Sequence, residues 1–295
     1  MQDQPRENRR SRFLTLPAIL VVAVVTQVPI LVTLALSFVR WIVVRPDLGI
    51  SFTGIGNYFL LFTDPDFYAV VLQTIELTLV SLIACTILGL FFALLLNRDF
   101  FGVNVVRTLI ISPFFVMDAV AGIIWKTLIL HPSFGFNGYI AAFFHTKPID
   151  FFGAYSLLTV ILLTVWQWTP FFILIILAGL QGISEEILDS AKVDGAGWFR
   201  TLFSIKIPSI YNHIEVAMML GTIFILKVFG LIYVTTSGGP GVSSTNLAYY
   251  VYRVAFYGWD VGRAAAIAIV TAVLTLIAIM ALFRFFQRRF KEWEV

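Results

Sequence analysis

Residues 183–208, ISEEILDSAKVDGAGWFRTLFSIKIP, form the longest polar interruption between the hydrophobic segments of this chain. Ser184 followed by Glu186 is typical of a helix start with acidic residues in its first turn. Gly195 and Gly197 allow backbone angles that end a helix and turn the chain sharply. The stretch therefore predicts two short helices around a glycine turn, each with an apolar face: Ile187, Leu188 and Ala191 on the first, and Trp198, Leu202, Phe203 and Ile205 on the second. A plain solvated loop is the alternative, although a loop that only turned the chain would not need two apolar faces.

The composition of the chain is that of a membrane protein. Of its 295 residues, 59% are hydrophobic and only 13% are charged, and the mean hydropathy is +0.92. A soluble domain has about a quarter of its residues charged. The single cysteine, Cys85, excludes an intrachain disulfide, and the three histidines show no metal-ligand spacing. The net charge of +3 comes from basic residues at the ends of hydrophobic segments, which indicates membrane topology and not nucleic-acid binding.

Six hydrophobic segments are long enough to cross a bilayer, for which about 20 residues suffice. They are residues 13–39, 69–96, 108–130, 152–180, 209–235 and 261–286. The first is too long for a signal-peptide core and no small-residue cleavage site follows it, so we expect a retained helix. We therefore predict an all-α polytopic membrane protein with six transmembrane helices. One transmembrane domain covers residues 13–287, flanked by polar segments 1–12 and 288–295, and residues 183–208 lie between its fourth and fifth helices.

The arginines and lysines predict the orientation of these helices. Most of them lie before the first helix, between the second and the third, within 183–208, and after the sixth. Lys and Arg accumulate on the cytoplasmic side of a membrane. Both termini and the 183–208 stretch are therefore predicted to be cytoplasmic.

A resemblance to a known family rests on this same stretch. Asp189-Ser190-Ala191, then DGA at 194–196, Phe203 and the closing Ile207-Pro208 resemble the EAA loop of binding-protein-dependent ABC importer permeases. The common form is roughly E-A-A-x-x-D-G-A with a closing Leu-Pro, so Asp189, Ser190 and Ile207 depart from it while keeping charge and size. The resemblance implies that the loop docks in a groove of a cytoplasmic ATPase subunit, with Glu186, Asp189, Ser190, Ala191, Asp194, Gly195, Ala196 and Gly197 as the coupling residues. Asp194 has a second interpretation, as the local cap of the second short helix.

A second segment resembles the carbohydrate branch of these permeases. It contains KVF at 227–229, TTSGGPG at 235–241 and LAYYVYR at 247–253, although the branch usually has Asp where this chain has Gly230. Residues 246–253 and 256–266 are most similar to sugar-alcohol importers. The resemblance implies a bacterial inner-membrane protein with a second, similar permease subunit, two ATPase subunits and an external solute-binding protein. No cofactor is expected in this chain, because ATP and Mg would be bound by the ATPase and no G-x-x-x-x-G-K-[ST] loop occurs here.

Ionisable residues within the predicted helices are candidates for a substrate pathway, because burying a charge in a membrane is costly. Asp118 lies near the middle of its segment and is the best single candidate, followed by Lys227 and Glu76. Glu76 and Lys227 have an alternative interpretation, as a structural ion pair between helices. Lys126 is close to the end of its segment, so we expect its side chain to extend to the outer interface.

Aromatic and amide side chains beside Pro170 are the second set of candidates. A sugar site stacks the ring on aromatic faces and satisfies the hydroxyls with hydrogen bonds. Trp166, Gln167 and Trp168 offer both kinds of group next to a proline that is expected to kink the helix. Packing inside the helix bundle is the simpler alternative for either tryptophan. Tyr249, Tyr250, Tyr252 and Trp259 are interpreted first as an interfacial aromatic belt and second as a docking site for an external binding protein.

These observations lead to one hypothesis and one main alternative. The hypothesis is a permease subunit of an ATP-driven importer for a small carbohydrate, a sugar alcohol or an oligosaccharide. The alternative is an ion- or proton-coupled secondary transporter, in which Asp118 and Glu76 would relay protons. Six helices without an inverted repeat argue against that alternative. We expect no enzymatic activity, since no nucleophile–base pair is apparent.

Overall fold

The computed structural model describes residues 4–290, and they are almost entirely helical. Five helices are long and apolar enough to cross a membrane, and a sixth span is possible if one sharply bent pair of helices counts as one. The chain divides into two compact units, Met1–Asp64 with Val251–Ala272 and Pro65–Tyr250 with Val273–Val295. The apolar, mostly helical character predicted from composition is confirmed.

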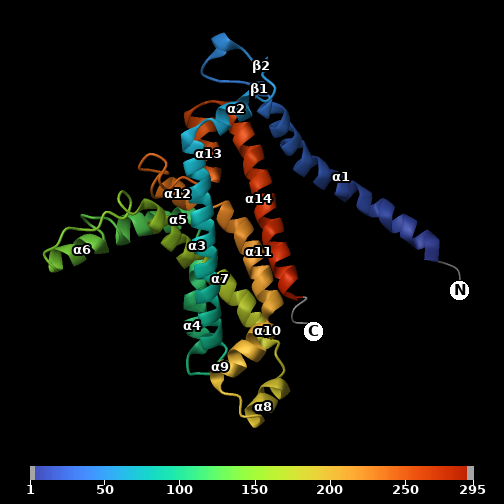
Figure 1. Ribbon diagram of the computed structural model, residues 1–295, viewed down its shortest axis with the longest axis vertical. Helices are drawn as coiled ribbons and strands as arrows, with labels where there is room; N and C mark the ends of the chain where they lie inside the picture. Colours follow the sequence, from blue (N-terminus) through green and yellow to red (C-terminus); the bar gives the residue numbers. More distant parts are fainter. Residues whose placement is uncertain (1–3, 291–295) are drawn as a thin grey trace. The chain divides into compact units, whose positions relative to one another are not determined.

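The first unit contains the long helix α1 (Gln4–Ser37), which is drawn in blue in Figure 1. It also contains β1 (Val39–Arg40) paired antiparallel with β2 (Ser51–Phe52), the 3-10 turn η1 (Pro46–Leu48), α2 (Gly56–Phe62), the π-turn η5 (Arg253–Tyr257) and the start of α14 (Val261–Phe290). The amide nitrogen of Asn57 donates to the carbonyls of Ser37 at 2.8 Å and Val39 at 2.9 Å, which fastens α2 to the end of α1. Because α1 begins at Gln4, the predicted polar segment joins the first span without a break.

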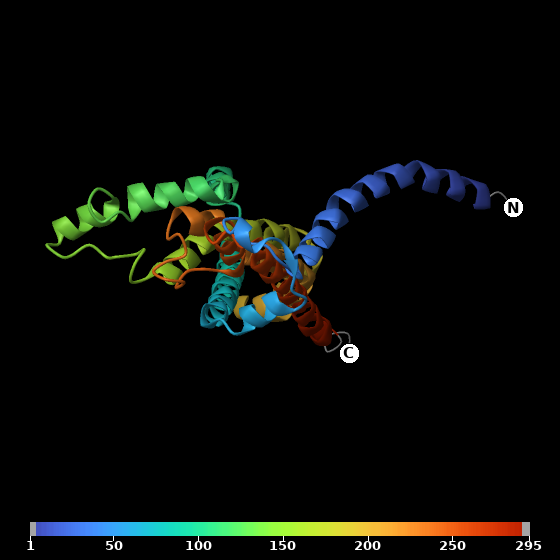
Figure 2. The same cartoon turned by 90° about the horizontal axis from the view of Figure 1, so that it is seen from above.

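The second unit is built around three helices, α3 (Pro65–Leu96), α7 (Ser156–Gln181) and α11 (Tyr211–Leu226), which lie side by side in Figures 1 and 2. Their contact centres on the fully buried ring of Phe172. A Cβ added at Gly89 would come within 2.6 Å of the Phe172 Cβ, and one at Gly221 within 2.4 Å of the ring. Glycines on both neighbours therefore make room for one large side chain, as is usual between membrane helices.

The third and fifth predicted helices are each interrupted: the third is a sharply bent pair, whereas the fifth still forms one candidate span, Tyr211–Val234. In place of residues 108–130, α4 (Val103–Ile111) and the 3-10 turn η2 (Ser112–Phe115) meet α5 (Asp118–Ile123) and the π-turn η3 (Ile124–Ile129) at a bend of 98°. Pro113 has no backbone N–H to continue the helix, and Val116 and Met117 have extended backbones with ψ of 128° and 137°. In place of residues 209–235, α11 ends at Leu226 and α12 (Gly230–Val234) follows after a short break.

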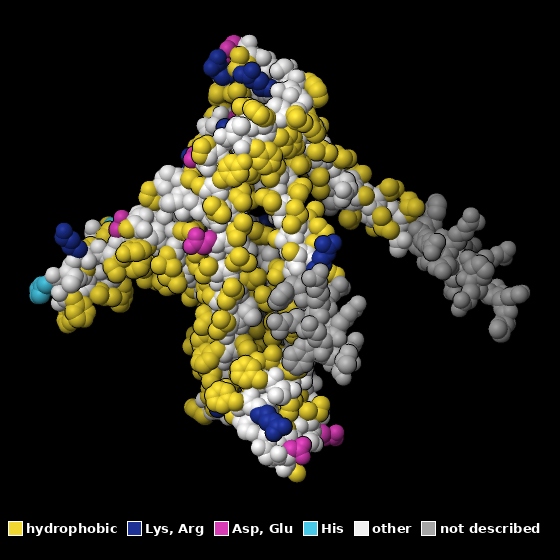
Figure 3. Space-filling model, in the orientation of Figure 1, with side chains coloured by type: hydrophobic (Ala, Val, Ile, Leu, Met, Phe, Trp, Pro, Cys, Tyr) yellow, Lys and Arg dark blue, Asp and Glu magenta, His cyan; other side chains and the backbone are white. Residues whose placement is uncertain are grey.

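Shorter elements complete the second unit. α6 (Phe136–Phe143) follows η3, and α13 (Leu247–Tyr252) follows the loop after α12. Between α7 and α11 come α8 (Glu185–Val193), α9 (Trp198–Thr201), the π-turn η4 (Leu202–Lys206) and α10 (Ile207–Ser209), at the lower end of this unit in Figure 1. In the view of Figure 3, hydrophobic side chains cover the middle of this unit, and charged ones gather at its lower end.

Candidate functional site

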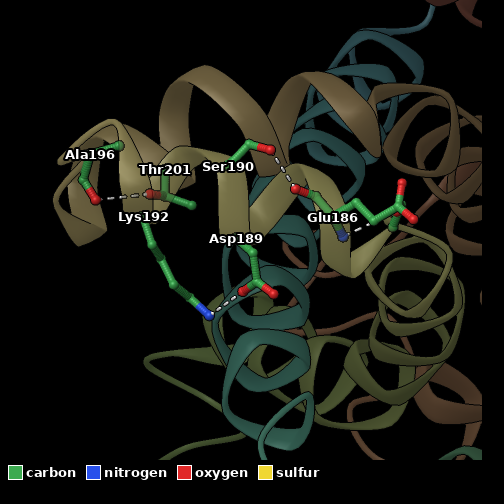
Figure 4. A network of polar contacts seen from close by, with 7 residues as sticks. Glu186, Asp189, Ser190, Lys192, Ala196 and Thr201 are labelled. Carbon is green, nitrogen blue, oxygen red and sulfur yellow. Dashed lines mark hydrogen bonds and ion pairs between the residues drawn. The ribbon is translucent and has the colours of Figure 1, made fainter.

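The 183–208 stretch forms the two short helices that its local chemistry predicts. The Ser184 hydroxyl oxygen accepts a hydrogen bond from the Glu186 backbone N–H at 3.2 Å and so caps α8 (Figure 4). Gly195 turns the chain with φ of +73°, a value that side chains disfavour. Gly197 has φ of −67° and serves as the N-cap of α9, so its backbone is not unusual. The prediction of a glycine turn between helices is confirmed at Gly195.

The charged groups of this loop face solvent. The Lys192 Nζ lies 2.8 Å from the Asp189 Oδ1, and this contact raises the pKa of Lys192 (Figure 4). The Ser190 hydroxyl donates to the Glu186 carbonyl at 2.8 Å. Asp194 closes α8 with its backbone N–H, which bonds to the Ser190 carbonyl. The interpretation of Asp194 as the cap of the second helix is wrong, since Gly197 occupies that position without a side-chain cap.

The apolar residues of the loop divide into buried and exposed ones. Ala191 and Leu202 are buried against the protein. Five large side chains remain exposed and are called the loop surface here: Ile187, Val193, Trp198, Phe199 and Phe203. Val193 is 88% exposed and Phe199 71%. The loop surface therefore combines exposed apolar side chains with the charged groups of α8.

The first helix break is held by Gln167, a candidate from the sequence. Its side chain on α7 is 3% exposed, and its Nε2 donates to the Val116 carbonyl at 2.8 Å and to the Asp118 Oδ1 at 2.9 Å. The Val116 carbonyl lies at the break, where helical bonding stops. Backbone groups at membrane depth need an internal partner. Gln167 supplies that partner and at the same time orients the Asp118 carboxylate.

The second break is held by Asn246, which the sequence did not single out. The Asn246 Nδ2 donates to the Val228 carbonyl at 2.6 Å, and its Oδ1 accepts from the Tyr249 N–H at 2.9 Å. Each break thus places a backbone carbonyl against a buried amide side chain. In the sequence, Asn246 is a polar residue directly before a helix rich in aromatic residues. That position does not predict its hydrogen bond to Val228, which lies 18 residues earlier.

The two breaks adjoin each other. A Cβ added at Gly230, the first residue of α12, would lie 2.7 Å from the Asp118 Cβ. The Lys126 Nζ donates to the Val234 carbonyl at 2.9 Å and ties η3 to the end of α12. The Lys126 ammonium thus bonds within the protein, and its extension to the outer interface stays a prediction. Asp118, at the start of α5, therefore packs directly against the start of α12.

Trp168 belongs to an aromatic cluster, whereas Trp166 lies apart from it. The Trp168 ring stacks on Phe224 at 5.0 Å and contacts Phe114 and Phe171 edge-on at 5.6 and 6.0 Å. Trp166 instead contacts Trp125 at 5.3 Å, because residues two apart in a helix lie on nearly opposite faces. Sequence analysis missed the three phenylalanines; Phe171, three residues after Trp168, carried the only periodic signal.

The remaining charged candidates differ in their surroundings. The Lys227 Nζ lies 5.6 Å from the centre of the Phe224 ring, which links it to Trp168. Glu76 is exposed on α3 and forms no ion pair with Lys227, so the interpretation of these two as a structural pair is wrong. Among the candidates, Asp118 and Gln167 are therefore joined by a hydrogen bond, and Trp168 and Lys227 both contact Phe224. Glu76 and Trp166 take part in neither group of contacts.

Tyr249 and Tyr250 are core residues. They are 1% and 4% exposed, and the Tyr249 ring lies 5.8 Å from Phe229 and 6.5 Å from Tyr233. The interpretation of these tyrosines as an interfacial belt is wrong. The Tyr249 ring therefore packs beside the second break, where Phe229 precedes α12.

Comparison with known protein families decides the class of this chain. Residues 85–292 match the model of the family described as binding-protein-dependent transport system inner membrane component. The chain belongs to this family. Its members are permease subunits of ABC importers, which favours that hypothesis over the secondary transporter.

Individual relatives cover almost the whole chain. It is 33% identical over 277 residues to a probable ABC transporter permease protein, y4oQ, of Sinorhizobium fredii, covering 92% of this chain and 89% of that one. It is also 33% identical over 273 residues to the trehalose/maltose transport system permease protein MalF of Thermococcus litoralis, covering 92% and 91%. A chain in the crystal structure of a bacterial alginate ABC transporter superposes with a TM-score of 0.80 at 20% identity, covering 97% and 98%, and shows the same fold.

Proposed function

We propose that this chain is one membrane subunit of an ATP-driven ABC importer for a small carbohydrate, with a sugar alcohol and an oligosaccharide among the candidate substrates. The family assignment supports the importer, and the names of two relatives, a trehalose/maltose and a sulfoquinovosyl glycerol permease, support the substrate class. In this proposal the bent pair of α4 and α5 counts as one of six spans. The subunit lies in a bacterial inner membrane with both termini and α8 in the cytoplasm, as the distribution of basic residues supports.

The proposed partners follow from the surfaces of the chain. The loop surface, with Asp189 and Asp194 beside it, docks on one of two cytoplasmic ATPase subunits that bind ATP and Mg. The spanning part of α1, Thr15–Ser37, buries none of its most apolar window within the described chain, which leaves it available to lipid or to a second, similar permease. An external solute-binding protein delivers the substrate.

Force passes from the loop to the breaks through α11. The Ile210 N–H donates to the Lys206 carbonyl at 3.1 Å. The chain from η4 through α10 to α11 is therefore helical except for one interruption at Ile210. α11 spans 16 residues, a rise of about 24 Å. Phe224 and Lys227 lie at the far end of α11. The Phe224 ring stacks on Trp168, and the Lys227 Nζ lies over the Phe224 ring. Closure of the ATPase dimer moves α8, and α11 carries that movement as a rigid rod to the second break.

The substrate contacts are proposed on the side chains gathered at the breaks. The Asp118 carboxylate, one oxygen of which Gln167 holds, accepts hydrogen bonds from sugar hydroxyls. The Trp168 and Phe224 rings offer apolar faces to the carbon skeleton, and Lys227 supplies donors. Glu76 and Trp166 have no place in this site.

The observation that carries the proposal is an exposed apolar loop surface on a chain of this family. Cells that contain the complete transporter would be given radiolabelled trehalose, maltose or sorbitol. Uptake should stop when ATP is depleted and continue when an ionophore collapses the ion gradients. A Val193→Glu, Phe199→Glu variant should also lose uptake, while Tyr139→Glu, an equally exposed aromatic on α6, should retain it. Uptake that survives ATP depletion would refute the proposal.

A further inference from the structure

An apolar groove of about 420 Å³ lies between α3, α4 with η2, and α7, next to the first helix break. Its walls include Leu88 and Phe92 on α3, Ile110 on α4, and Leu162, Trp166 and Ile173 on α7. The Thr169 hydroxyl, which also borders the groove, already donates to the Val165 carbonyl at 2.6 Å. With so little hydrogen-bonding capacity, the groove is suited to a hydrocarbon chain and not to a sugar.

The length of the groove matches one half of a membrane. From Leu162 to Ile173 the α7 backbone rises about 16 Å, and half of a hydrocarbon core of about 30 Å is about 15 Å. The groove therefore has room for the acyl chain of a phospholipid in a single leaflet.

The guanidinium group of Arg107 lies about one helical turn beyond one end of this groove. Arg107 follows the same face of α4 as Ile110, and its Nη2 donates to the carbonyl of Leu96 at 3.3 Å. Leu96 in turn lies one turn after Phe92 on α3. Within residues 4–290 the Arg107 side chain forms no ion pair, and its Nε is buried without a hydrogen-bond partner. The buried Nε cannot reach a ligand, but a guanidinium with one hydrogen bond and no ion pair within the described chain keeps Nη donors that suit a phosphate at this end of the groove.

We propose that this groove binds an anionic phospholipid, with an acyl chain along Leu162–Ile173 and its phosphate on Arg107. The site is separate from the substrate contacts, and the binding itself does not depend on the proposed import function. The proposed orientation adds that the lipid belongs to the cytoplasmic leaflet, where anionic headgroups accumulate. The lipid would fill a gap between α4 and α7 just below the first break.

The test is native mass spectrometry of the full chain, purified and supplied with limiting phosphatidylglycerol or phosphatidylcholine. The protein should retain one phosphatidylglycerol in preference to phosphatidylcholine. Arg107→Gln should weaken phosphatidylglycerol retention about tenfold or more, since a charge-assisted hydrogen bond is lost. Arg200→Gln, which removes an exposed charge on α9 away from the groove, should change nothing. Equal retention by Arg107→Gln and the unaltered protein would overturn the proposal.

A second measurement avoids variants that fill the groove and fail to fold. Phosphatidylglycerol with brominated acyl chains quenches tryptophan fluorescence on contact, and Trp166 lines the groove. Quenching should saturate at a low mole fraction of this lipid, and Trp166→Phe should remove the saturating component. Quenching that rises only in proportion to bulk lipid, or crosslinking of Leu162→Cys to a helix of another subunit in place of lipid, would contradict the assignment.

Discussion

Replacing Gln167 by Met tests whether one amide holds the first helix break. Methionine has a similar length but no donor, so the Val116 carbonyl loses its 2.8 Å bond and the Asp118 carboxylate its 2.9 Å bond. Side-chain hydrogen bonds between membrane helices average about 0.6 kcal/mol, while orphaning a buried polar group costs about 1–3 kcal/mol. We expect Gln167→Met to destabilise the folded protein by roughly 1–3 kcal/mol. We also expect a raised KM for uptake, because Asp118 is no longer oriented.

The assay compares thermal unfolding of the purified protein with uptake by the complete transporter. Thr164→Val is the matched control: Thr164 is 0% exposed on the same helix, and its hydroxyl bonds only to the Val160 carbonyl one turn before it. Removing that hydroxyl should cost less than about 1 kcal/mol and leave KM unchanged. If Gln167→Met behaves like Thr164→Val in both measurements, the break does not depend on the amide and the reasoning fails.

Three further outcomes are expected. Gly230→Ala should destabilise the protein by about 1–3 kcal/mol, because its Cβ would lie 2.7 Å from the Asp118 Cβ, whereas Gly197→Ala, with no atom within 4 Å, should be neutral in the same thermal assay. Asp189→Asn should leave the unfolding midpoint unchanged, since exposed pairs contribute little to folding, and should lower ATP-coupled uptake several-fold; a loss of stability with normal uptake would argue against coupling. Asp189 raises the pKa of Lys192 above its ordinary value of 10.5. The contribution of this ion pair to folding stability is therefore fully present below pH 10.5 and is lost only as the pH rises through the raised pKa. Uptake measured from neutral pH to about 9 should therefore show no fall from this pair.

Local chemistry explains why the 183–208 stretch was predicted correctly. The Ser184 cap, the acidic first turn and the positive φ of Gly195 are all determined within a few residues. Hydropathy likewise gave the apolar, helical class of the chain and the approximate limits of α3, α7 and α14. The family resemblance rested on the same stretch, and the match over residues 85–292 confirms it.

The helix breaks could not be derived from hydropathy, because Asp118 and Lys227, the charged residues beside them, lie within stretches that are otherwise mostly apolar. Pro113 marked a place where a helix can end, but the extended backbone at Val116 is stabilised by Gln167, which lies 51 residues later. The carbonyl of Val228 depends in the same way on Asn246. The sequence offered Asp118 and Gln167 as separate candidates, and only the packing of α7 against the break brings them together.

The burial of aromatic residues was the other source of error. Tyr249 and Tyr250 have the composition of an interfacial belt, yet they pack behind the second break. Trp166 and Trp168 are separated by one residue in the sequence but contact aromatic residues on different segments. Which side of a membrane helix faces protein depends on the helices packed around it. The spacing of apolar residues within the helix does not identify those neighbouring helices.

The central claim, that the loop surface transmits ATP-driven movement, is tested most directly by a crosslink. Cys85 is replaced by Ser, and a single cysteine is placed at Val193, which is 88% exposed, or at Tyr139 on α6 as the control, which is 68% exposed. Each is paired with cysteines on the groove of the ATPase subunit in the assembled transporter. The account predicts a crosslink from position 193 whose yield changes on ATP addition, and none from position 139. No crosslink from position 193 in transporters that still import substrate would contradict it.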